Sequence, residues 1–136
     1  MKNNIDAILN FVHFCDTAFL SQDNKLNLIG IFKNIQTSQF PFTYPKISCA
    51  LSLNIRKESR LKIQILCQKS RELITKMEGN LTPSKDTDQS VEIGFIADFQ
   101  GIRFEKSGQY DLEVWINNEL IDTQSFFIQE VKNEKK

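Results

Sequence analysis

The chain has 136 residues, the size of one domain, and its 17 basic residues balance 17 acidic ones. Without net charge it lacks the positive field that binding to nucleic acid or an anionic membrane demands. No segment reaches the ~20 apolar residues of a membrane-spanning helix, and residues 1–10 lack the apolar block of an export signal. Three cysteines, an odd number, favour a reducing compartment, so we expect a cytoplasmic protein.

The N-terminal part predicts two strands. Residues 8–15 form the first, apolar on both faces, and Asp16 is expected to end it as a turn residue. A hairpin near Asp23 and Asn24 then leads into the apolar run that begins at Lys25. Because residues 8–15 have no polar face, we expect this strand to be central in a sheet or covered.

The middle of the chain alternates between polar and apolar residues with a period of two, which predicts half-buried strands. The inward positions of the two clearest runs are Ile47, Cys49, Leu51, Leu53 and Ile55, followed by Leu61, Ile63, Ile65 and Cys67. Three polar residues, 57–59, separate these runs and predict a hairpin that pairs Ile55 with Leu61 and Cys49 with Cys67.

The C-terminal half continues the alternation. Strands are predicted at 73–77, 91–99, 110–116 and 120–130, and Asn117–Asn118 favours a tight turn because asparagine tolerates positive φ. The polar segment 79–90 is expected to be a loop. About eight or nine strands with little or no helix predict an all-β, two-sheet antiparallel β-sandwich, immunoglobulin-like in style. Residues 1–130 are expected to form this single domain, with a frayed, charged tail over 131–136.

The candidates for catalysis and metal binding are weak. His13, the only histidine, and Cys15 lie two apart on a strand, where we expect a packed thiol and a buried imidazole. His13 and the three cysteines are suitable ligand types for zinc, but no Cys-x₂-Cys pair occurs. Asp86 and Asp88 offer too few oxygens for calcium. We therefore predict no catalytic residue, no metal and no cofactor.

The strongest positive signal is the segment Phe40–Tyr44, in which Phe40, Phe42 and Tyr44 fall on one side of an extended, proline-restrained stretch. The rings either close one edge of the sandwich or form an aromatic ridge for a partner or ligand. On the final strand, Phe126 and Phe127 point to opposite faces, so one ring needs cover outside the core. Phe40, Phe42, Tyr44 and Phe127 are the candidate partner-binding residues, and a homodimer would cover them.

Four elements along the chain resemble those of a family of small uncharacterised bacterial β-sandwich proteins. In order they are Cys15-Asp16, Lys25–Gly30 (KLNLIG), Phe40-Pro41-Phe42, and Gly108-Gln109-Tyr110 leading to 126–128. The resemblance implies a compact sandwich and no established activity. The Gly-x-Tyr element also resembles the tyrosine corner of immunoglobulin-like sandwiches, in which a phenol bonds back to the backbone.

Together these features predict a non-catalytic binding or scaffolding module of the bacterial cytoplasm, acting on an unknown protein partner or on itself, without nucleic acid or membrane. The alternative is a small-molecule or carbohydrate-binding domain that uses the aromatic segment Phe40–Tyr44.

Overall fold

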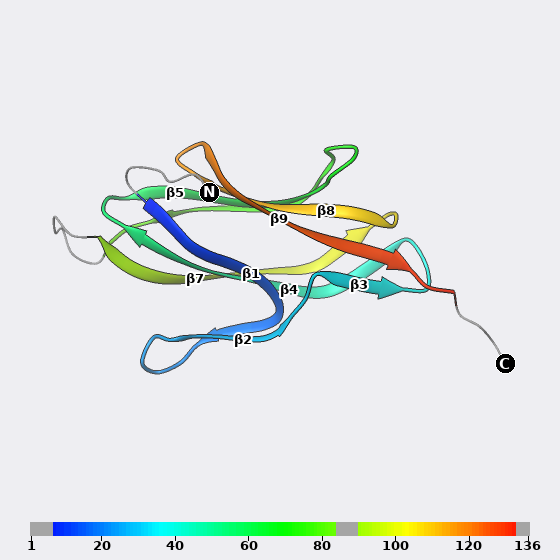
Figure 1. Ribbon diagram of the computed structural model, residues 1–136, viewed down its shortest axis with the longest axis horizontal. Helices are drawn as coiled ribbons and strands as arrows, with labels where there is room; N and C mark the ends of the chain where they lie inside the picture. The colour runs from blue at the N-terminus through cyan, green and yellow to red at the C-terminus, as the bar shows by residue number, and fades with distance from the viewer. Residues whose placement is uncertain (1–6, 84–89, 133–136) are drawn as a thin grey trace.

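The computed structural model describes residues 7–83 and 90–132, which form nine strands and no helix. Sheet A has the strand order β2-β1-β4-β7, and sheet B has the order β3-β9-β8-β5-β6 (Figure 1). The strands are β1 (Ala7–Leu20), β2 (Leu26–Ile31), β3 (Asn34–Thr37), β4 (Phe42–Ile55), β5 (Ser59–Cys67), β6 (Leu73–Leu81), β7 (Val91–Phe104), β8 (Gly108–Ile116) and β9 (Glu119–Glu130). The all-β, two-sheet sandwich predicted from the sequence is confirmed.

The core lies between the sheets and is built from the alternate residues that the period of two selects. The inward side chains of β4 and β5 are almost completely buried, and so are those of β8 at Tyr110, Leu112, Val114 and Ile116. Alternation therefore identified the buried face of each of these strands correctly.

The predicted hairpin between residues 46–56 and 61–67 is wrong. β4 pairs with β1 and β7 in sheet A, whereas β5 pairs with β6 and β8 in sheet B. Residues 56–58 therefore carry the chain from one sheet to the other, and Cys49 is not paired with Cys67. A short polar connection leaves both strands with the same inward residues whether they pair side by side or face each other across the core.

In sheet B, the turn between β8 and β9 was predicted, whereas the outermost strand β3 was not. Asn117 and Asn118 have φ angles of 50° and 67°, which confirms the tight turn between β8 and β9. The four-residue β3 pairs in parallel with the end of β9 and was not predicted. β6 extends to Leu81, so residues 79–81 of the predicted loop belong to a strand. Residues 84–89, which include Asp86 and Asp88, lie outside the described residues, and so do residues 133–136 of the tail.

Tyr110 forms the corner that the Gly-x-Tyr element predicts. Its side chain is 1% exposed, and its phenol donates a 2.6 Å hydrogen bond to the carbonyl of Lys106. The ring packs edge-on against Phe104 at 4.9 Å and is stacked on Phe126 at 5.8 Å. Burial of a large ring with its polar end satisfied ties the β7–β8 corner to the core.

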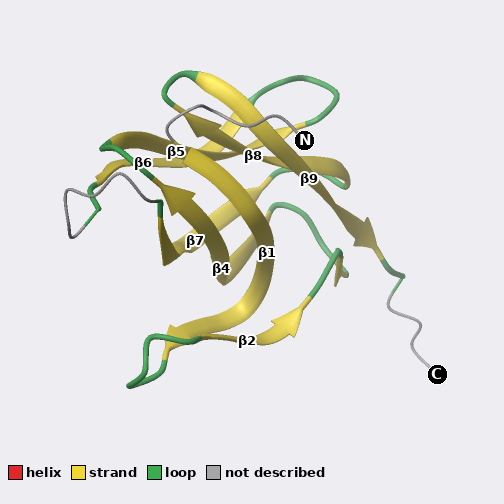
Figure 2. Ribbon diagram, turned by 60° about the vertical axis from the view of Figure 1, so that its left-hand side comes forward, coloured by secondary structure: helices red, strands yellow, loops and turns green. Residues whose placement is uncertain are grey.

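β1 is longer than predicted and bends (Figure 2). Asp16 lies within the strand rather than ending it: β1 pairs with β4 as far as Cys15 and with β2 from Cys15 onward. The β1–β2 hairpin, residues 16–31, folds back over the outer face of sheet A. Its tip reaches β7, where Leu26 lies so close to Gly94 that a Cβ there would approach a leucine carbon to 2.9 Å.

This folding back changes the environment of the outer face of β4. Ser48, Ala50 and Ser52, which alternation places on the polar, solvent side, are buried. The expectation that residues 46–56 present a solvated face is therefore wrong in the centre of the strand, because the hairpin forms a partial third layer over it.

Candidate binding surface

The β1–β2 hairpin is held in position by polar contacts at its base. Tyr44 donates a 3.1 Å hydrogen bond from its phenol to the carboxylate of Asp16, and the Lys46 ammonium donates to the Thr17 hydroxyl at 2.9 Å. Gly30, at φ 75°, lies directly against the carboxylate of Asp16, which a Cβ at this position would contact. The positive φ strains any residue with a Cβ, so glycine is favoured at this position beside Asp16.

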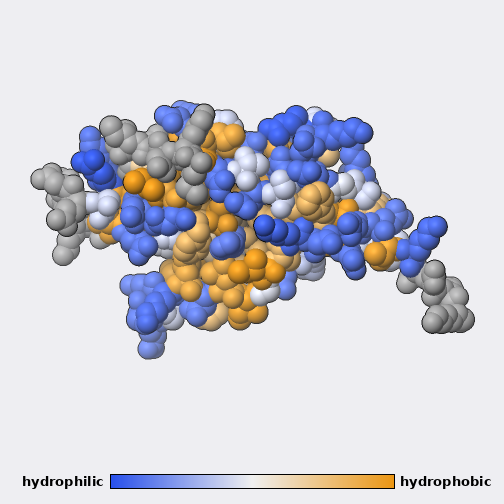
Figure 3. All heavy atoms as spheres, in the orientation of Figure 1, coloured by the Kyte–Doolittle hydropathy of each residue, from blue (hydrophilic) through white to orange (hydrophobic). Residues whose placement is uncertain are grey.

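The hairpin and the strand that leads into it carry most of the exposed apolar side chains. Of the nine large hydrophobic residues exposed in the described ranges, six belong to β1 and β2: Ile8, Phe11, Phe19, Leu20, Ile29 and Ile31. Ile29 and Ile31 are 57% and 56% exposed. Figure 3 shows apolar atoms gathered over the part of this face where β1 and β2 lie. Isolated apolar residues are normal on a surface, but a gathered patch indicates an interaction site.

A hollow of about 320 Å³ lies between the hairpin tip and sheet A, lined by Phe11, Lys25, Leu26, Ser52 and Glu92, among others. A smaller hollow of about 230 Å³ adjoins Leu20 and Ile93. These two hollows lie where the tip of the hairpin does not fully cover sheet A. Apolar side chains such as Phe11 and Ile93 border them.

The three predicted aromatic residues lie at and just before the start of β4, an inner strand of sheet A that pairs there with the end of β7. Phe40, Phe42 and Tyr44 are half-buried and pack against the core, with the Tyr44 ring 6.0 Å from Phe32 and 5.9 Å from Phe42. The Phe40–Pro41 peptide bond is cis. The packing of the rings against the core favours the inward-packing interpretation of the segment over an aromatic ridge, although β4 is not an edge strand.

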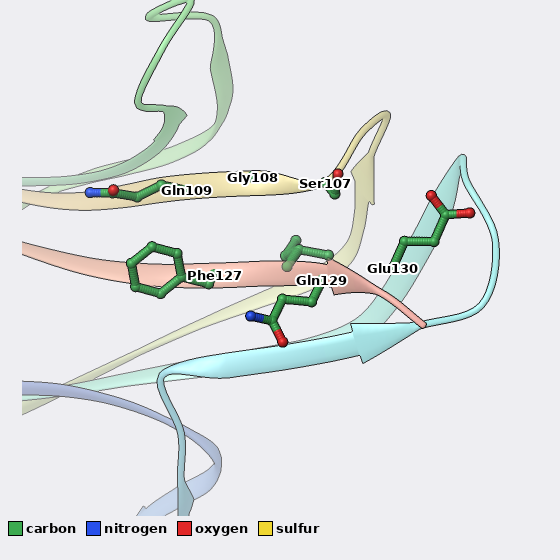
Figure 4. Close-up of a pocket in the computed structure, with 7 residues that line it drawn as sticks. Ser107, Gly108, Gln109, Phe127, Gln129 and Glu130 are labelled. Atoms are coloured by element: carbon green, nitrogen blue, oxygen red, sulfur yellow. The ribbon is translucent and has the colours of Figure 1, made fainter. Parts of the chain in front are cut away.

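Phe127, the fourth predicted residue, is in sheet B, and the structure does not bring it together with the other three. It is 45% exposed and borders a hollow of about 490 Å³ over Gly108, flanked by Gln109, Gln129 and Glu130 (Figure 4). The side-chain amide of Gln129 accepts a 3.3 Å hydrogen bond from Asn34. The hollow therefore combines one apolar ring with amide and carboxylate groups.

His13, Cys15 and Cys49 are not arranged for nucleophilic chemistry, whereas at Cys67 burial would raise the pKa but hydrogen bonds with Ser70 and Lys69 lower it. His13 is exposed and stacks on Phe11 at 5.6 Å, which corrects the prediction of a buried imidazole. Cys15 is buried, and its thiol donates to the Thr17 carbonyl at 3.3 Å; burial raises its pKa. Burial also raises the pKa of Cys49 to about 12. Both thiols are protonated at neutral pH, and thiols rather than thiolates are poor nucleophiles.

No group of three or more His, Cys, Asp or Glu side chains within residues 7–83 and 90–132 is placed to hold a metal ion. Among the four zinc-ligand candidates, Cys49 faces the core from sheet A and Cys67 belongs to sheet B. The exposed ring of His13 lies on the outer side of sheet A. The topology separates these residues.

Sequence reasoning missed a polar network on the outer face of sheet B. Glu113 is only 3% exposed and accepts hydrogen bonds from Arg71 (2.8 Å), Gln64 (2.8 Å) and the indole of Trp115 (3.0 Å). Burial alone would raise the pKa of Glu113, but these three donors outweigh it and hold the pKa below its ordinary value. Lys62 lies over the Trp115 ring at 4.6 Å. Every partner of this network comes from the chain itself, so it is a structural feature rather than a vacant binding site.

Comparison of the sequence with known families gives one match, to a family of unknown function, DUF6941, over residues 10–129. The chain belongs to this family. The match confirms the resemblance to a small uncharacterised family. A search of curated proteins finds no relative. No helix of the described residues is long and apolar enough to span a membrane.

Comparison with solved structures gives matches at low identity. An immunoglobulin-like protein from Pseudomonas aeruginosa matches with a TM-score of 0.50 and 13% identity, covering 91% of this chain and 97% of that one. The DNA glycosylase AlkC of Pseudomonas fluorescens (TM-score 0.47, 10% identity) covers 87% of this chain, and a β-glucosidase of Listeria innocua (TM-score 0.47, 8% identity) covers 74%. The chain spans only 30% and 15% of these two longer proteins. The likeness to the immunoglobulin-like protein shows the fold alone.

Proposed function

We propose that this protein is a non-catalytic binding module of the bacterial cytoplasm, and that the β1–β2 hairpin is its recognition surface for another protein chain. The observation that carries this proposal is the apolar patch on the hairpin, where Ile29 and Ile31 are more than half exposed. The hydrogen bonds to Asp16 and Thr17 hold the hairpin in place. The surface is thus ordered before a partner arrives, which lowers the entropic cost of binding.

Two further features support the absence of catalysis and the reducing compartment. The one imidazole is exposed and stacked on Phe11 instead of lying beside a nucleophile. All three cysteines are free and buried, as suits a chain that folds without disulfides.

A capture experiment tests the proposal. The wild-type protein is used as bait, beside the double variant Phe19→Ser, Ile31→Ser and the matched control Leu73→Ser, which removes an exposed apolar residue from sheet B. A stoichiometric partner chain should be retained by wild type and control and lost from the double variant. Equal capture by all three proteins would show that the hairpin is not the recognition surface.

The hollow beside Phe127 favours a second candidate function, binding of a small molecule or carbohydrate. An apolar ring flanked by Gln109, Gln129 and Glu130 suits a ligand with both C–H and hydroxyl groups. A sugar at 100 times its dissociation constant should stabilise the fold by about 2.7 kcal/mol. Thermal melting against a sugar panel tests this, and Phe127→Ala should abolish any shift; no shift with any sugar speaks against this candidate.

A further inference from the structure

The strands at the ends of the two sheets differ in how they are protected. A sheet edge presents unpaired backbone groups, and natural proteins blunt it with charges, bulges or short length. The outermost strands are β2 and β7 in sheet A and β3 and β6 in sheet B. β3 has four residues, β6 carries Lys76 and Glu78, and β7 carries charges such as Glu92 and Asp98. β2, with the sequence LNLIGI, has neither a charge nor a proline and is the most apolar of the four.

The hydrogen-bond pattern shows which groups of β2 face the open edge. The Ser21 amide donates to the Lys25 carbonyl at 2.9 Å, and the pairing continues with Leu20–Leu26, Phe19–Asn27 and Ala18–Leu28. In an antiparallel ladder every second pair exchanges hydrogen bonds. Lys25 and Asn27 therefore bond to β1, whereas Leu26 and Leu28 direct their peptide groups away from it.

We infer that β2 pairs antiparallel with β2 of a second copy of this chain, about a two-fold axis at Leu28, so that two four-stranded sheets A become one continuous sheet. The inference rests on the proposed function, since it names the chain that the hairpin recognises. In this register Leu28 lies opposite Leu28 of the second copy, and Leu26 opposite Gly30. Two-fold pairing is self-consistent because both strands present the same outward peptide groups.

The charges around β2 allow a second copy to approach this edge. At one end of β2, Asp23 and Lys25 pair with each other at 3.1 Å, and at the other end the exposed Lys33 follows the strand. Between these ends β2 is uncharged, and the whole chain has no net charge, so no repulsion opposes the approach of two copies.

The apolar area is of the size that such an interface needs. A standard interface buries ~800 Å² on each partner, of which about 57%, or ~450 Å², is apolar. Phe19, Leu20, Ile29 and Ile31 are each about half exposed. Half of four large side chains amounts to roughly 350 Å², so the hairpin alone supplies most of the apolar part.

Cross-linking tests the register directly. Hydrogen-bonded residues opposite each other in an antiparallel pair have Cα atoms ~5.5 Å apart, within the range that a disulfide spans. Leu28→Cys should therefore form a covalent dimer under mild oxidation in nearly all molecules. The control Leu73→Cys, on the outermost strand of sheet B, should remain monomeric. The native cysteines are buried and do not compete.

Sedimentation of the untagged wild-type protein gives an independent measurement that does not depend on the cysteine variant folding. A dimer is expected at ~100 μM, and Ile29→Lys should weaken it at least tenfold, whereas Leu73→Lys should leave it unchanged. A monomer at this concentration, or equal cross-linking of both cysteine variants, would overturn the β2 dimer. The capture experiment separates the two proposals, because a hairpin-dependent foreign partner bound by a monomeric protein leaves the proposed function standing.

Discussion

The outer faces of the two sheets are covered in different ways. In sheet B, Arg71 reaches across the strands and its guanidinium pairs with the buried Glu113, so the polar groups satisfy one another. In sheet A, the β1–β2 hairpin covers Ser48 and Ala50 but turns its own apolar residues outward. In sheet B the polar side chains complete the face by themselves, whereas in sheet A a hairpin with apolar residues on its outer side covers the face and leaves a new apolar surface. Mutations on sheet B should therefore mainly change the free energy of unfolding, whereas mutations on the hairpin should mainly change the association of the protein.

The largest expected effect is at Tyr110, which belongs to the framework of sheet B. Tyr110→Ala should lower the free energy of unfolding by about 3–5 kcal/mol, because it removes a fully buried ring that contacts Phe104 and Phe126. Tyr110→Phe should cost only about 1 kcal/mol, the net value of the hydrogen bond to Lys106. Urea denaturation measures both. Equal losses for the two variants would show that the ring contributes little.

Glu113 should show the next largest effect. Glu113→Gln should destabilise the fold by about 1–2 kcal/mol, because the charge-assisted bond from Arg71 is lost while the amide still contacts Gln64 and Trp115. Most of the Arg71 side chain is exposed, so solvent screens the pair and keeps the loss at the low end.

The same residue predicts an acid dependence. The folded-state pKa of Glu113 is lowered from 4.5, so the unfolded chain binds the proton more tightly. Its stabilising contribution is complete above about pH 4.5 and is lost as the pH falls through the lowered folded-state pKa. Stability measured between pH 3 and 6 should fall less steeply in Glu113→Gln than in wild type. Parallel curves would mean that Glu113 is not selectively stabilised as the carboxylate.

The features of the two sheets that were predictable from the sequence are those set by residues close together along the chain. Alternation predicted the inward faces, the tolerance of asparagine for positive φ predicted the Asn117–Asn118 turn, and the resemblance of the Gly-x-Tyr element implied the Tyr110 corner. Each of these follows from neighbouring residues. The partners of β4 and β5 were not predictable, since a three-residue connection fits a hairpin and an inter-sheet crossover equally well. The outward apolar patch did have a signal: residues 8–15 and 26–31 lack a polar face. Which of their residues remain exposed depends on the bend of β1 at Asp16, which no local pattern encodes.

Cys15 probes the junction between the hairpin and sheet A. Cys15→Ser should cost about 1 kcal/mol, at the low end for burying a hydroxyl, because serine can donate to the same carbonyls of Thr17 and Ser48. Cys15→Val keeps the volume and removes the donor, so it serves as the matched comparison. Thermal melting of both variants measures the effect. A loss above about 3 kcal/mol for serine would show that the junction tolerates no polar group at this position.

The smallest effect on the isolated chain is expected at Ile29, where the comparison between the two regions is sharpest. Because this side chain is more than half exposed, Ile29→Lys should change the stability of a dilute sample by no more than about 0.5 kcal/mol. Association that stabilises only the folded state makes the melting temperature depend on protein concentration. The wild-type melting temperature should therefore rise between about 1 and 100 μM, a range that spans micromolar dissociation constants. The rise should vanish in Ile29→Lys and persist in Leu73→Lys, since Leu73 is equally apolar but lies on sheet B. A melting temperature that is independent of concentration in all three proteins would remove the distinction between the hairpin and the rest of the surface.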